Sequence, residues 1–342
     1  MTTDRWDPRR CNDEKPGAGL IGAADWFGAG RPAPFPSDEA LRARLASRLE
    51  SHPKIQLLIS HKGGMGDTVM CTTVAHELRR RGMKDIWLET RWVEDFAGQS
   101  VFDGVLPESY ETEWLAVTLG GRIVYPAYAR ALPAEDREIG PAGHILGEMC
   151  RQAGIVGRIT LRPYFEAPGD GLRDLPEDFI AISGAGGHAV LTKNWFQERY
   201  HALSAMLRKD LRLVQLGSPS EPPIDGADDW RGRTTLRQAA DVLKRARCYV
   251  GEVGGLMHLA RAVDCPAVVI YGGREAPRQS GYVANVNLAG NVPCSPCWII
   301  KNCPHEMGCM DLIRPADVAA AVRRLLDSCP GRPLHADSIT LE

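Results

Sequence analysis

Several features of secreted, membrane and nucleic-acid-binding proteins are missing from this 342-residue sequence. Its start, Met1-Thr2-Thr3-Asp4-Arg5-Trp6-Asp7, lacks the apolar segment of a secretory signal. No uninterrupted apolar run approaches the roughly 18 residues of a membrane-spanning helix. Neither sign of charge is in excess, since 41 Lys and Arg face 43 Asp and Glu for a formal charge of -2. We therefore expect a soluble cytoplasmic protein without a nucleic-acid partner, with the inner face of the membrane as the alternative location.

The composition is that of a globular chain large enough for two domains. Hydrophobic residues make up 44% and charged residues 25% of the chain. At about 100–200 residues per domain, the length favours two domains over one. Residues 1–52 are rich in glycine and proline, with one helical run from Ser37 to Leu49. We interpret this stretch as an N-terminal extension that lies on a domain.

Beyond the extension, strand and helix patterns alternate, which is typical of a doubly wound parallel sheet. The pattern begins with a strand at Ile55–Ser60, a helix at Thr68–Arg81 and a strand at Ile86–Glu89. After a linker-like stretch near residue 170 it resumes more clearly. The predicted elements there are strands at Phe179–Ser183, Leu211–Leu216, Cys248–Val253 and Ala267–Tyr271, and helices at Trp195–Lys209, Thr234–Arg247, Leu256–Val263 and Pro315–Asp327. We predict an α/β protein with two Rossmann-like domains, residues 53–170 and 171–342, that face a central cleft.

The turn after the first strand, His61–Thr68, is neither a Walker A loop nor a complete dinucleotide fingerprint. Gly66 lets a ligand approach the backbone, and Asp67 lies at the start of a helix. Asp67 is either a helix cap or a general base that faces the cleft. The helix N-terminus would keep its carboxylate ionised.

Two further turns lie at the ends of predicted strands. Lys193 precedes a helix beside the glycine-rich stretch Ser183–Gly187, where it is either a diphosphate ligand or a solvated lysine. Gly254 and Gly255 bring backbone amides to another helix start, with His258 one turn further on. This turn suits an anion, although His258 could equally be a buried core histidine. The three turns together predict one cleft.

Four of the ten cysteines fall in one short segment, Cys294, Cys297, Cys303 and Cys309, and the other six are scattered along the chain. Four thiolates this close can surround one tetrahedral ion, and soft sulfur ligands favour zinc or iron. Reduced buried thiols and two local disulfides are the alternatives, and His305 is a substitute ligand. Because the segment follows the last predicted strand, we expect a structural metal there.

These motifs resemble the ADP-heptose heptosyltransferases, the family-9 glycosyltransferases of GT-B fold, over roughly Ile55–Leu326. The motifs on which the resemblance rests are Gly66-Asp67, Lys193-Asn194-Trp195, the turn Gly217–Glu221, and Gly254–Ala260. The resemblance implies that Asp67 is the catalytic base and that Lys193 contacts the donor phosphates. It also implies that Glu221 binds the donor ribose, and that Gly254, Gly255 and His258 lie at the nucleotide-sugar site.

The mechanism that the resemblance implies is inverting transfer from a nucleotide-diphosphate sugar. Lys193 and the amides of Gly254 and Gly255 would stabilise the leaving diphosphate without a catalytic divalent metal. The chain departs from the family at Val253, where an aspartate usually contacts the donor. Glu252 is one residue early, and in a strand this shift turns its side chain to the other face.

The four-cysteine segment resembles the cysteine finger of heptosyltransferases that modify autotransporter proteins, in which the metal is iron. That resemblance favours protein hydroxyl groups over a lipopolysaccharide core as the acceptor. An oligomer of identical chains is a further expectation. The alternative functions are a GT-B sugar-nucleotide epimerase, for which Glu252 is the candidate carboxylate, and a decayed transferase that serves as a binding or assembly subunit.

Overall fold

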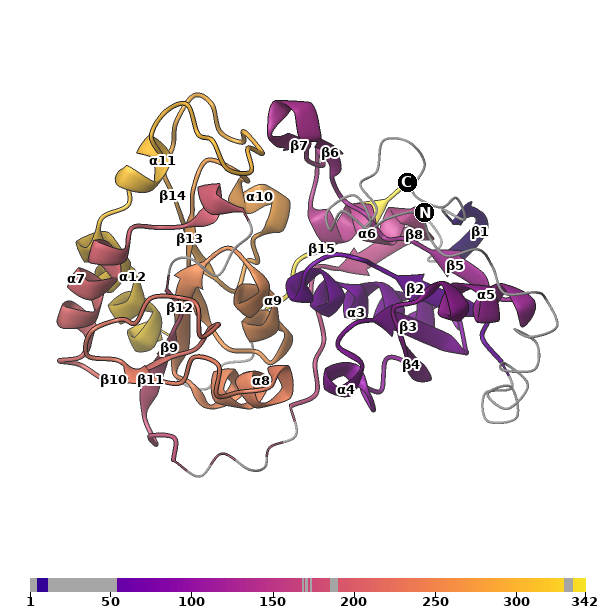
Figure 1. The fold of residues 1–342 in the computed structure, drawn as a ribbon, viewed down its shortest axis with the longest axis horizontal. Coiled ribbons are helices and arrows are strands. Elements are labelled where there is room, and N and C mark those ends of the chain that lie inside the picture. Colours follow the sequence, from indigo (N-terminus) through magenta and orange to yellow (C-terminus); the bar gives the residue numbers. More distant parts are fainter. Residues whose placement is uncertain are drawn as a thin grey trace.

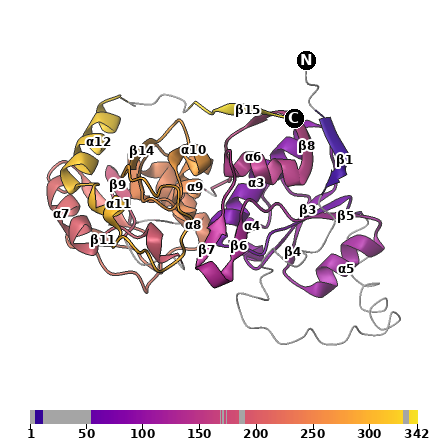
Figure 2. The ribbon, with the colours of Figure 1, turned by 90° about the horizontal axis from the view of Figure 1, so that it is seen from above.

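The computed structural model describes residues 5–11, 54–167, 169, 172, 174–184, 190–328 and 335–342. The helix predicted at 37–49 lies outside these residues, and so does most of the glycine stretch that follows Ser183. The chain forms two lobes side by side, with the N-terminal half in one and most of the C-terminal half in the other (Figure 1). The same two lobes are seen from above in Figure 2.

The N-terminal domain is built on a parallel sheet of order β4-β3-β2-β5. Apolar runs such as Leu57-Leu58-Ile59 form its central strands, and these strands are buried on both faces, as parallel sheets require. The strands are β2 (Leu57–Ser60), β3 (Ile86–Thr90), β4 (Gly104–Pro107) and β5 (Arg122–Val124). The helices that connect them are α3 (Met65–Arg80), α4 (Val93–Phe96) and α5 (Tyr110–Thr118).

A short hairpin, β6 (Arg130–Leu132) and β7 (Arg137–Ile139), follows β5, with a 3₁₀ turn η1 (Pro133–Glu135) at its tip. It rises between the two lobes at the top of Figure 1. Helix α6 (Ile145–Gln152) and the strand β8 (Ala153–Thr160) complete this half of the chain. Strand and helix patterns are mixed in the sequence between residues 102 and 161, so none of these elements was predicted.

The two edges of β8 are both occupied by strands from distant parts of the chain. On one edge lies β1 (Arg5–Cys11) and on the other β15 (Ser338–Leu341), both antiparallel to β8. The domain boundaries expected from the sequence are therefore corrected, because β15 belongs to the N-terminal domain. Pairing on both sides leaves β8 without an open edge that could pair with another chain. The chain thus crosses between the lobes twice.

The C-terminal domain contains a six-stranded parallel sheet of order β11-β10-β9-β12-β13-β14. In this sheet β9 and β12 are neighbours although they are the first and fourth strands of the domain, which is the Rossmann order. The predicted strands are found within two residues of their expected ends. The six are β9 (Phe179–Ile182), β10 (Arg212–Gln215), β11 (Asp228–Asp229), β12 (Cys248–Glu252), β13 (Ala267–Tyr271) and β14 (Val286–Ala289).

The helices of this domain connect its strands and cover the sheet. Each predicted helix is present, although α7 and α8 are shorter than expected. The helices of the domain are η2 (Leu191–Lys193), α7 (Gln197–Leu207), α8 (Leu236–Arg245), α9 (Gly255–Ala262), α10 (Pro277–Ser280), α11 (Gly308–Asp311) and α12 (Pro315–Ser328). Helix α12 begins at a proline. The N–H that proline lacks has no hydrogen-bond partner in the first turn of a helix, so nothing is lost there.

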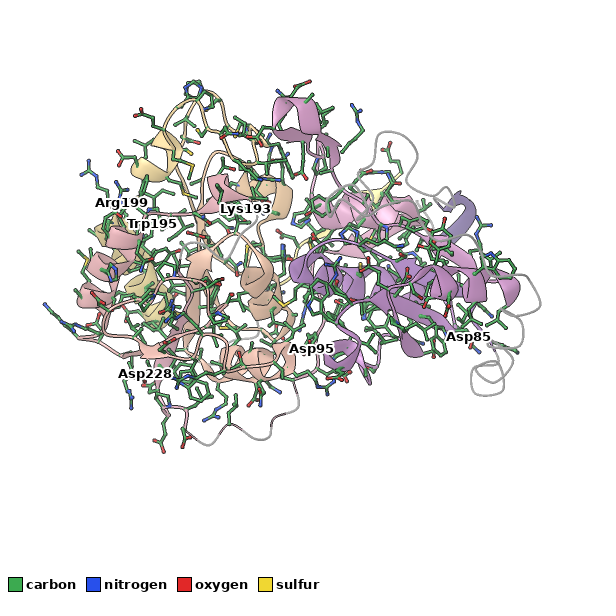
Figure 3. All side chains as sticks on the ribbon, viewed as in Figure 1. Asp85, Asp95, Lys193, Trp195, Arg199 and Asp228 are labelled. Atoms are coloured by element: carbon green, nitrogen blue, oxygen red, sulfur yellow. The ribbon has the colours of Figure 1, made fainter. Side chains whose placement is uncertain are left out.

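The lobes are held together by apolar packing and by polar contacts. One cluster of buried apolar side chains includes Leu57 and Val69 of the first domain and Met257 and Leu259 of the second. Helices α3 and α9 pack against each other across the boundary. Asp95 on α4, labelled between the lobes in Figure 3, accepts the Leu236 N–H at 3.1 Å and so caps α8 of the other domain. The two sheets are therefore fixed by side chains of both domains.

Within the described part of the chain, no helix combines the length and apolar character that a crossing of the bilayer requires.

Candidate active site

Asp67 and Tyr128 lie where strand order reverses in the N-terminal sheet. There β2 leads into the turn His61–Asp67, and its neighbour β5 leads into the segment that carries Tyr128. Open α/β sheets bind ligands at such switch points, outside the carboxyl ends of the strands. The Tyr128 hydroxyl donates a hydrogen bond to Asp67 Oδ1 at 2.8 Å.

Asp67 is the third residue of α3, which begins three residues earlier than predicted. Its Oδ2 accepts the Gly64 N–H at 2.6 Å, so the carboxylate caps the helix. His61 Nε2 lies 3.8 Å from the same oxygen. Burial alone would raise the pKa of Asp67, but His61, Tyr128 and the Gly64 amide together lower it below its ordinary value. The carboxylate stays ionised and 19% exposed, so the cap can also meet a substrate.

Tyr128 donates a hydrogen bond to Asp67 and keeps its own proton. Burial and the charge of Asp67 raise its pKa well above the ordinary value of a tyrosine. Its neutral hydroxyl therefore fixes the orientation of the aspartate and leaves the second oxygen, Oδ2, toward His61 and Gly64.

The glycine turn of the C-terminal domain meets the Asp67 turn directly. Gly254 and Gly255 follow β12 at the switch point between β9 and β12, and α9 begins at Gly255. A Cβ placed on Gly66 would lie only 2.7 Å from Gly255 Cα and 3.2 Å from its amide nitrogen. Two of the three predicted turns are thus in backbone contact, and the position of Gly66 requires glycine for that approach.

His258 lies directly behind this contact and is almost fully buried, with 5% of its surface exposed. Its Nδ1 is 2.6 Å from the Tyr282 hydroxyl. Burial lowers the pKa of His258 to about 4, so the ring is neutral at pH 7. The side chain is therefore a hydrogen-bonded buried histidine at the edge of the site, within the electrostatic reach of Asp67.

Lys193 is paired with a carboxylate that the sequence analysis did not single out. Its Nζ lies 2.7 Å from Glu275 Oε1, with Lys193 17% and Glu275 5% exposed. Burial would raise the pKa of Glu275, but the charges of Lys193 and Arg274 outweigh it and lower the value to about 2. Figure 3 places Lys193 on the side of its lobe that faces the N-terminal domain. An anion there would meet a fixed ammonium group.

The carboxylates of Glu221 and Glu252 each accept a hydrogen bond from a backbone amide. Glu221 Oε1 accepts the Ser218 N–H at 2.8 Å, so it closes its own loop after β10. Glu252 is buried and accepts the Trp195 N–H, while Val253 packs in the apolar cluster. The one-residue shift thus has the effect predicted for a strand. The Glu252 side chain thus anchors the segment that follows Lys193, and its role as an epimerase carboxylate stays a prediction.

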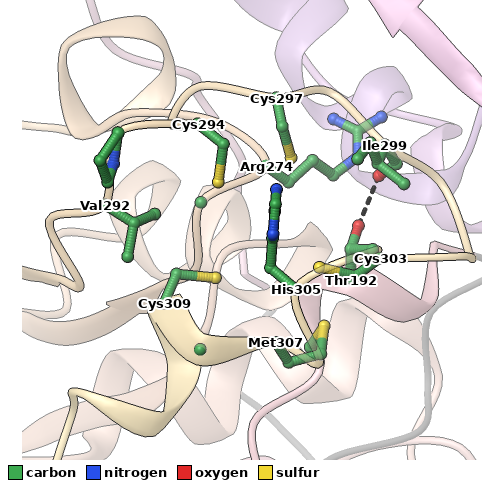
Figure 4. A pocket seen from close by; sticks show the side chains of 13 residues that line it. Thr192, Arg274, Val292, Cys294, Cys297, Ile299, Cys303, His305, Met307 and Cys309 are labelled. Carbon is green, nitrogen blue, oxygen red and sulfur yellow. Dashed lines mark hydrogen bonds between the residues drawn. The ribbon is translucent and has the colours of Figure 1, made fainter.

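The four clustered cysteines surround one cavity of about 400 Å³, which is also lined by His305. Figure 4 shows their sulfur atoms entering it from different sides. All four are free thiols in this structure, which contains neither of the two local disulfides. Among the residues that the structure describes, no group of three or more His, Cys, Asp or Glu is arranged to hold an ion. Sulfur ligands suit a soft metal, whereas the thiols in this structure are not placed as the ligands of one ion would be.

Tyr128 and Glu275 are the site residues that sequence reasoning missed. Glu275 follows the predicted strand Ala267–Tyr271 after two glycines, so the rule of strand ends could have found it. Tyr128 follows β5, whose three residues gave no recognisable strand pattern.

Two Rossmann-like domains whose switch points meet at one site define the GT-B fold, and solved structures share it. TibC, an iron-containing dodecameric glycosyltransferase from enterotoxigenic E. coli H10407, matches with a TM-score of 0.62 and 16% identity over 80% of this chain and 77% of its own. The ADP-heptose lps heptosyltransferase II of E. coli matches with a TM-score of 0.57 and 14% identity over 80% of this chain and 98% of its own.

The family follows from the sequence of the second domain. Residues 177–306 match the model of glycosyltransferase family 9 (heptosyltransferase). This part of the chain is therefore similar to family-9 glycosyltransferases, and the resemblance predicted from its motifs is confirmed. No curated protein sequence matches the chain significantly.

Proposed function

We propose that the protein transfers heptose from an ADP-heptose-type donor to an acceptor hydroxyl group, with inversion at the anomeric carbon. The observation that carries this proposal is the backbone contact between Gly66 and Gly255. It brings a partly exposed, ionised aspartate on one domain against the glycine turn at the switch point of the other. The match of residues 177–306 to heptosyltransferases supports the donor, and so does the structure of TibC in complex with ADP-D-beta-D-heptose.

In the proposed reaction Asp67 accepts the proton of the acceptor hydroxyl group. The acceptor oxygen forms a bond to the anomeric carbon while the bond from that carbon to the diphosphate oxygen breaks, and the electron pair leaves with the diphosphate. The low pKa of Asp67 keeps it ionised and makes it a weak base, so proton transfer accompanies bond formation and does not precede it.

Lys193 and the first amides of α9 would stabilise the charge that develops on the diphosphate. Glu275 holds the ammonium group in place through its 2.7 Å ion pair. Because a fixed cation is already present, we propose that the transfer needs no catalytic divalent metal. Full activity in the presence of excess EDTA is the expected result, and a loss that Mg²⁺ restores would contradict it.

The direct experiment is a transfer assay with a panel of ADP-, UDP- and GDP-sugars, offered with protein and lipopolysaccharide-core acceptors. We expect turnover with ADP-heptose, and loss of at least about a thousandfold in Asp67→Ala with nucleotide binding retained. Full activity of that variant would overturn the assignment of the base. Nucleotide binding without turnover on any acceptor would favour the decayed binding subunit, for which Val253 is the main argument.

The acceptor side of the proposal is a hydroxyl group on a protein or on a lipopolysaccharide core. Because the four-cysteine segment resembles that of heptosyltransferases that modify autotransporter proteins, we favour a protein acceptor, and the acceptor panel tests this choice. A cytoplasmic location stays a prediction that cell fractionation tests. TibC is dodecameric, so we also propose an oligomer of identical chains, to be measured by light scattering.

We further propose that Cys294, Cys297, Cys303 and Cys309 hold one structural iron or zinc ion. Their shared cavity and the iron of TibC support this assignment. Metal analysis of the purified protein should find about one equivalent, and Cys297→Ser and Cys303→Ser should each lose it. Less than about a tenth of an equivalent in the intact protein would remove the claim.

A further inference from the structure

Residues 298–302, between the second and third clustered cysteines, form a connector that joins the two domains. On one side the connector pairs with the β6–β7 hairpin of the N-terminal domain (Figure 1). The Glu138 N–H donates to Trp298 O at 2.9 Å, and the Ile300 N–H donates to Asp136 O at 2.9 Å. The Asp136 carboxylate also accepts the N–H groups of Lys301 at 3.1 Å and of Asn302 at 2.7 Å. The hairpin is thus tied to almost every residue of the connector.

On its other side the connector holds the residues that precede Lys193 and Glu275. The Thr192 N–H donates to Ile300 O at 3.3 Å, and Thr192 is the residue before Lys193. The Trp298 N–H donates to Arg274 O at 2.9 Å, and Arg274 is the residue before Glu275. Both partners of the ion pair at the candidate donor site are therefore anchored one residue away by the same five-residue segment.

The Trp298 side chain extends this link toward Asp67. Its ring lies against Gly140, where an added Cβ would come within 1.9 Å of Trp298 Cε2. The Arg274 guanidinium lies 4.6 Å from the Trp298 ring centroid and forms an ion pair with Glu138 of the hairpin. The centroid of the Tyr128 ring is 6.4 Å from that of the Trp298 ring, and the Tyr128 hydroxyl donates a hydrogen bond to Asp67. One buried indole thus lies between the supports of the base and those of the lysine.

We propose that the connector sets the position of Lys193 relative to Asp67 across the domain boundary, with Trp298 and Asp136 as positioning residues. This inference rests on the proposed function, in which the two side chains act on opposite ends of one reaction. Neither positioning residue touches the substrate in this account. Each acts through backbone contacts and packing, so its loss should lower turnover more than donor binding.

The test compares Asp136→Ala and Trp298→Ala with two matched variants. Glu135→Ala removes an exposed acid from the same hairpin, whose ion pair with Arg137 lies outside the connector. Trp298→Phe keeps an aromatic ring between Gly140 and Arg274. We expect kcat to fall about tenfold in Asp136→Ala and up to about a hundredfold in Trp298→Ala, with the donor KM changed less than about threefold. Glu135→Ala should match the wild type, and Trp298→Phe should recover most of the loss.

Hydrogen–deuterium exchange supplies a readout that does not depend on activity. In Asp136→Ala, exchange should rise in peptides that contain Thr192–Trp195 as well as in the connector, while β9 and β12 stay protected. Faster exchange confined to the hairpin and connector, with unchanged kcat, would overturn the proposal. If the wild type transfers no sugar but exchange spreads to Thr192–Trp195, the proposed function fails and the positioning link stands.

Discussion

Replacement of Gly66 by alanine should separate the two domains at the site without unfolding either of them. The added Cβ would lie 2.7 Å from Gly255 Cα, whereas ordinary contact begins at 3.4 Å, so the gap must widen by about 0.7 Å (3.4 − 2.7). The obstructing atoms of Gly255 are backbone, so no side chain can turn aside. Helix α3 or helix α9 has to move, and Asp67 or the glycine turn moves with it.

The expected free-energy change is small because two effects oppose each other. Alanine favours a helix over glycine by about 1 kcal/mol, and Gly66 is the second residue of α3. Overpacking costs about 1–3 kcal/mol. The variant should therefore lose about 0–2 kcal/mol of unfolding free energy. A displacement of this size between a base and a leaving-group site can cost about ten- to a hundredfold in kcat.

The assay measures kcat with ADP-heptose, the dissociation constant of ADP, and urea unfolding, each for Gly66→Ala and for a matched glycine. Gly143→Ala is the control, since an added Cβ there meets nothing within 4 Å. The control should keep the activity of the wild type. Equal activity of Gly66→Ala and the control would refute the argument that the two turns act in contact.

Three further substitutions test the electrostatics of the site. Tyr128→Phe removes a hydrogen bond that lowers the pKa of Asp67. Because a protonated base is inactive, the acid limb of the kcat/KM profile should move to higher pH, and an unmoved limb contradicts the role of the hydroxyl. Lys193→Ala takes the nearest cation from Glu275, so unfolding free energy should fall by about 2–3 kcal/mol and ADP should bind about tenfold more weakly. Unchanged ADP affinity in a calorimetric titration would exclude Lys193 as a phosphate ligand. His258 has a folded pKa of about 4 against 6.5 unfolded, so its contribution is complete above pH 6.5 and is lost as the pH falls toward 4. The wild type should therefore lose up to about 3 kcal/mol more than His258→Gln between pH 7 and pH 4 in urea unfolding, and parallel curves would disprove it.

The four central strands of the C-terminal sheet were predictable because they are short, largely buried runs, whereas β11 and β14 are neither fully buried nor continuously apolar and were not predicted. Cys248–Glu252 and Ala267–Tyr271 are continuous buried segments bounded by turns, so composition alone marks them. The start of α3 was placed too late, because Gly64-Met65-Gly66 looks like a loop in sequence. The region from 102 to 161 gave no assignment, because β5 and the hairpin strands have only three residues each.

The candidate site was predictable at the ends of strands and not in its pairings. Asp67, Lys193 and Gly254 were marked by glycine and charge beside a strand, which is a local pattern. Glu275 and Tyr128 complete the site through contacts with residues 82 and 61 positions away in the chain. Such contacts depend on how the elements and domains pack. The periodicity of helices and strands predicts the elements but not their packing.

The pairing of β8 with β1 and β15 also sets the order in which this protein can fold during its synthesis on the ribosome. β15 follows the entire second domain in sequence, yet it forms one edge of the three-stranded sheet in the first. The N-terminal lobe must therefore leave that edge of β8 open throughout the synthesis of its neighbour. Once β15 docks, it ties the chain's last described residues to the first lobe, and a protein truncated after α12 would expose β8 to pairing with other chains.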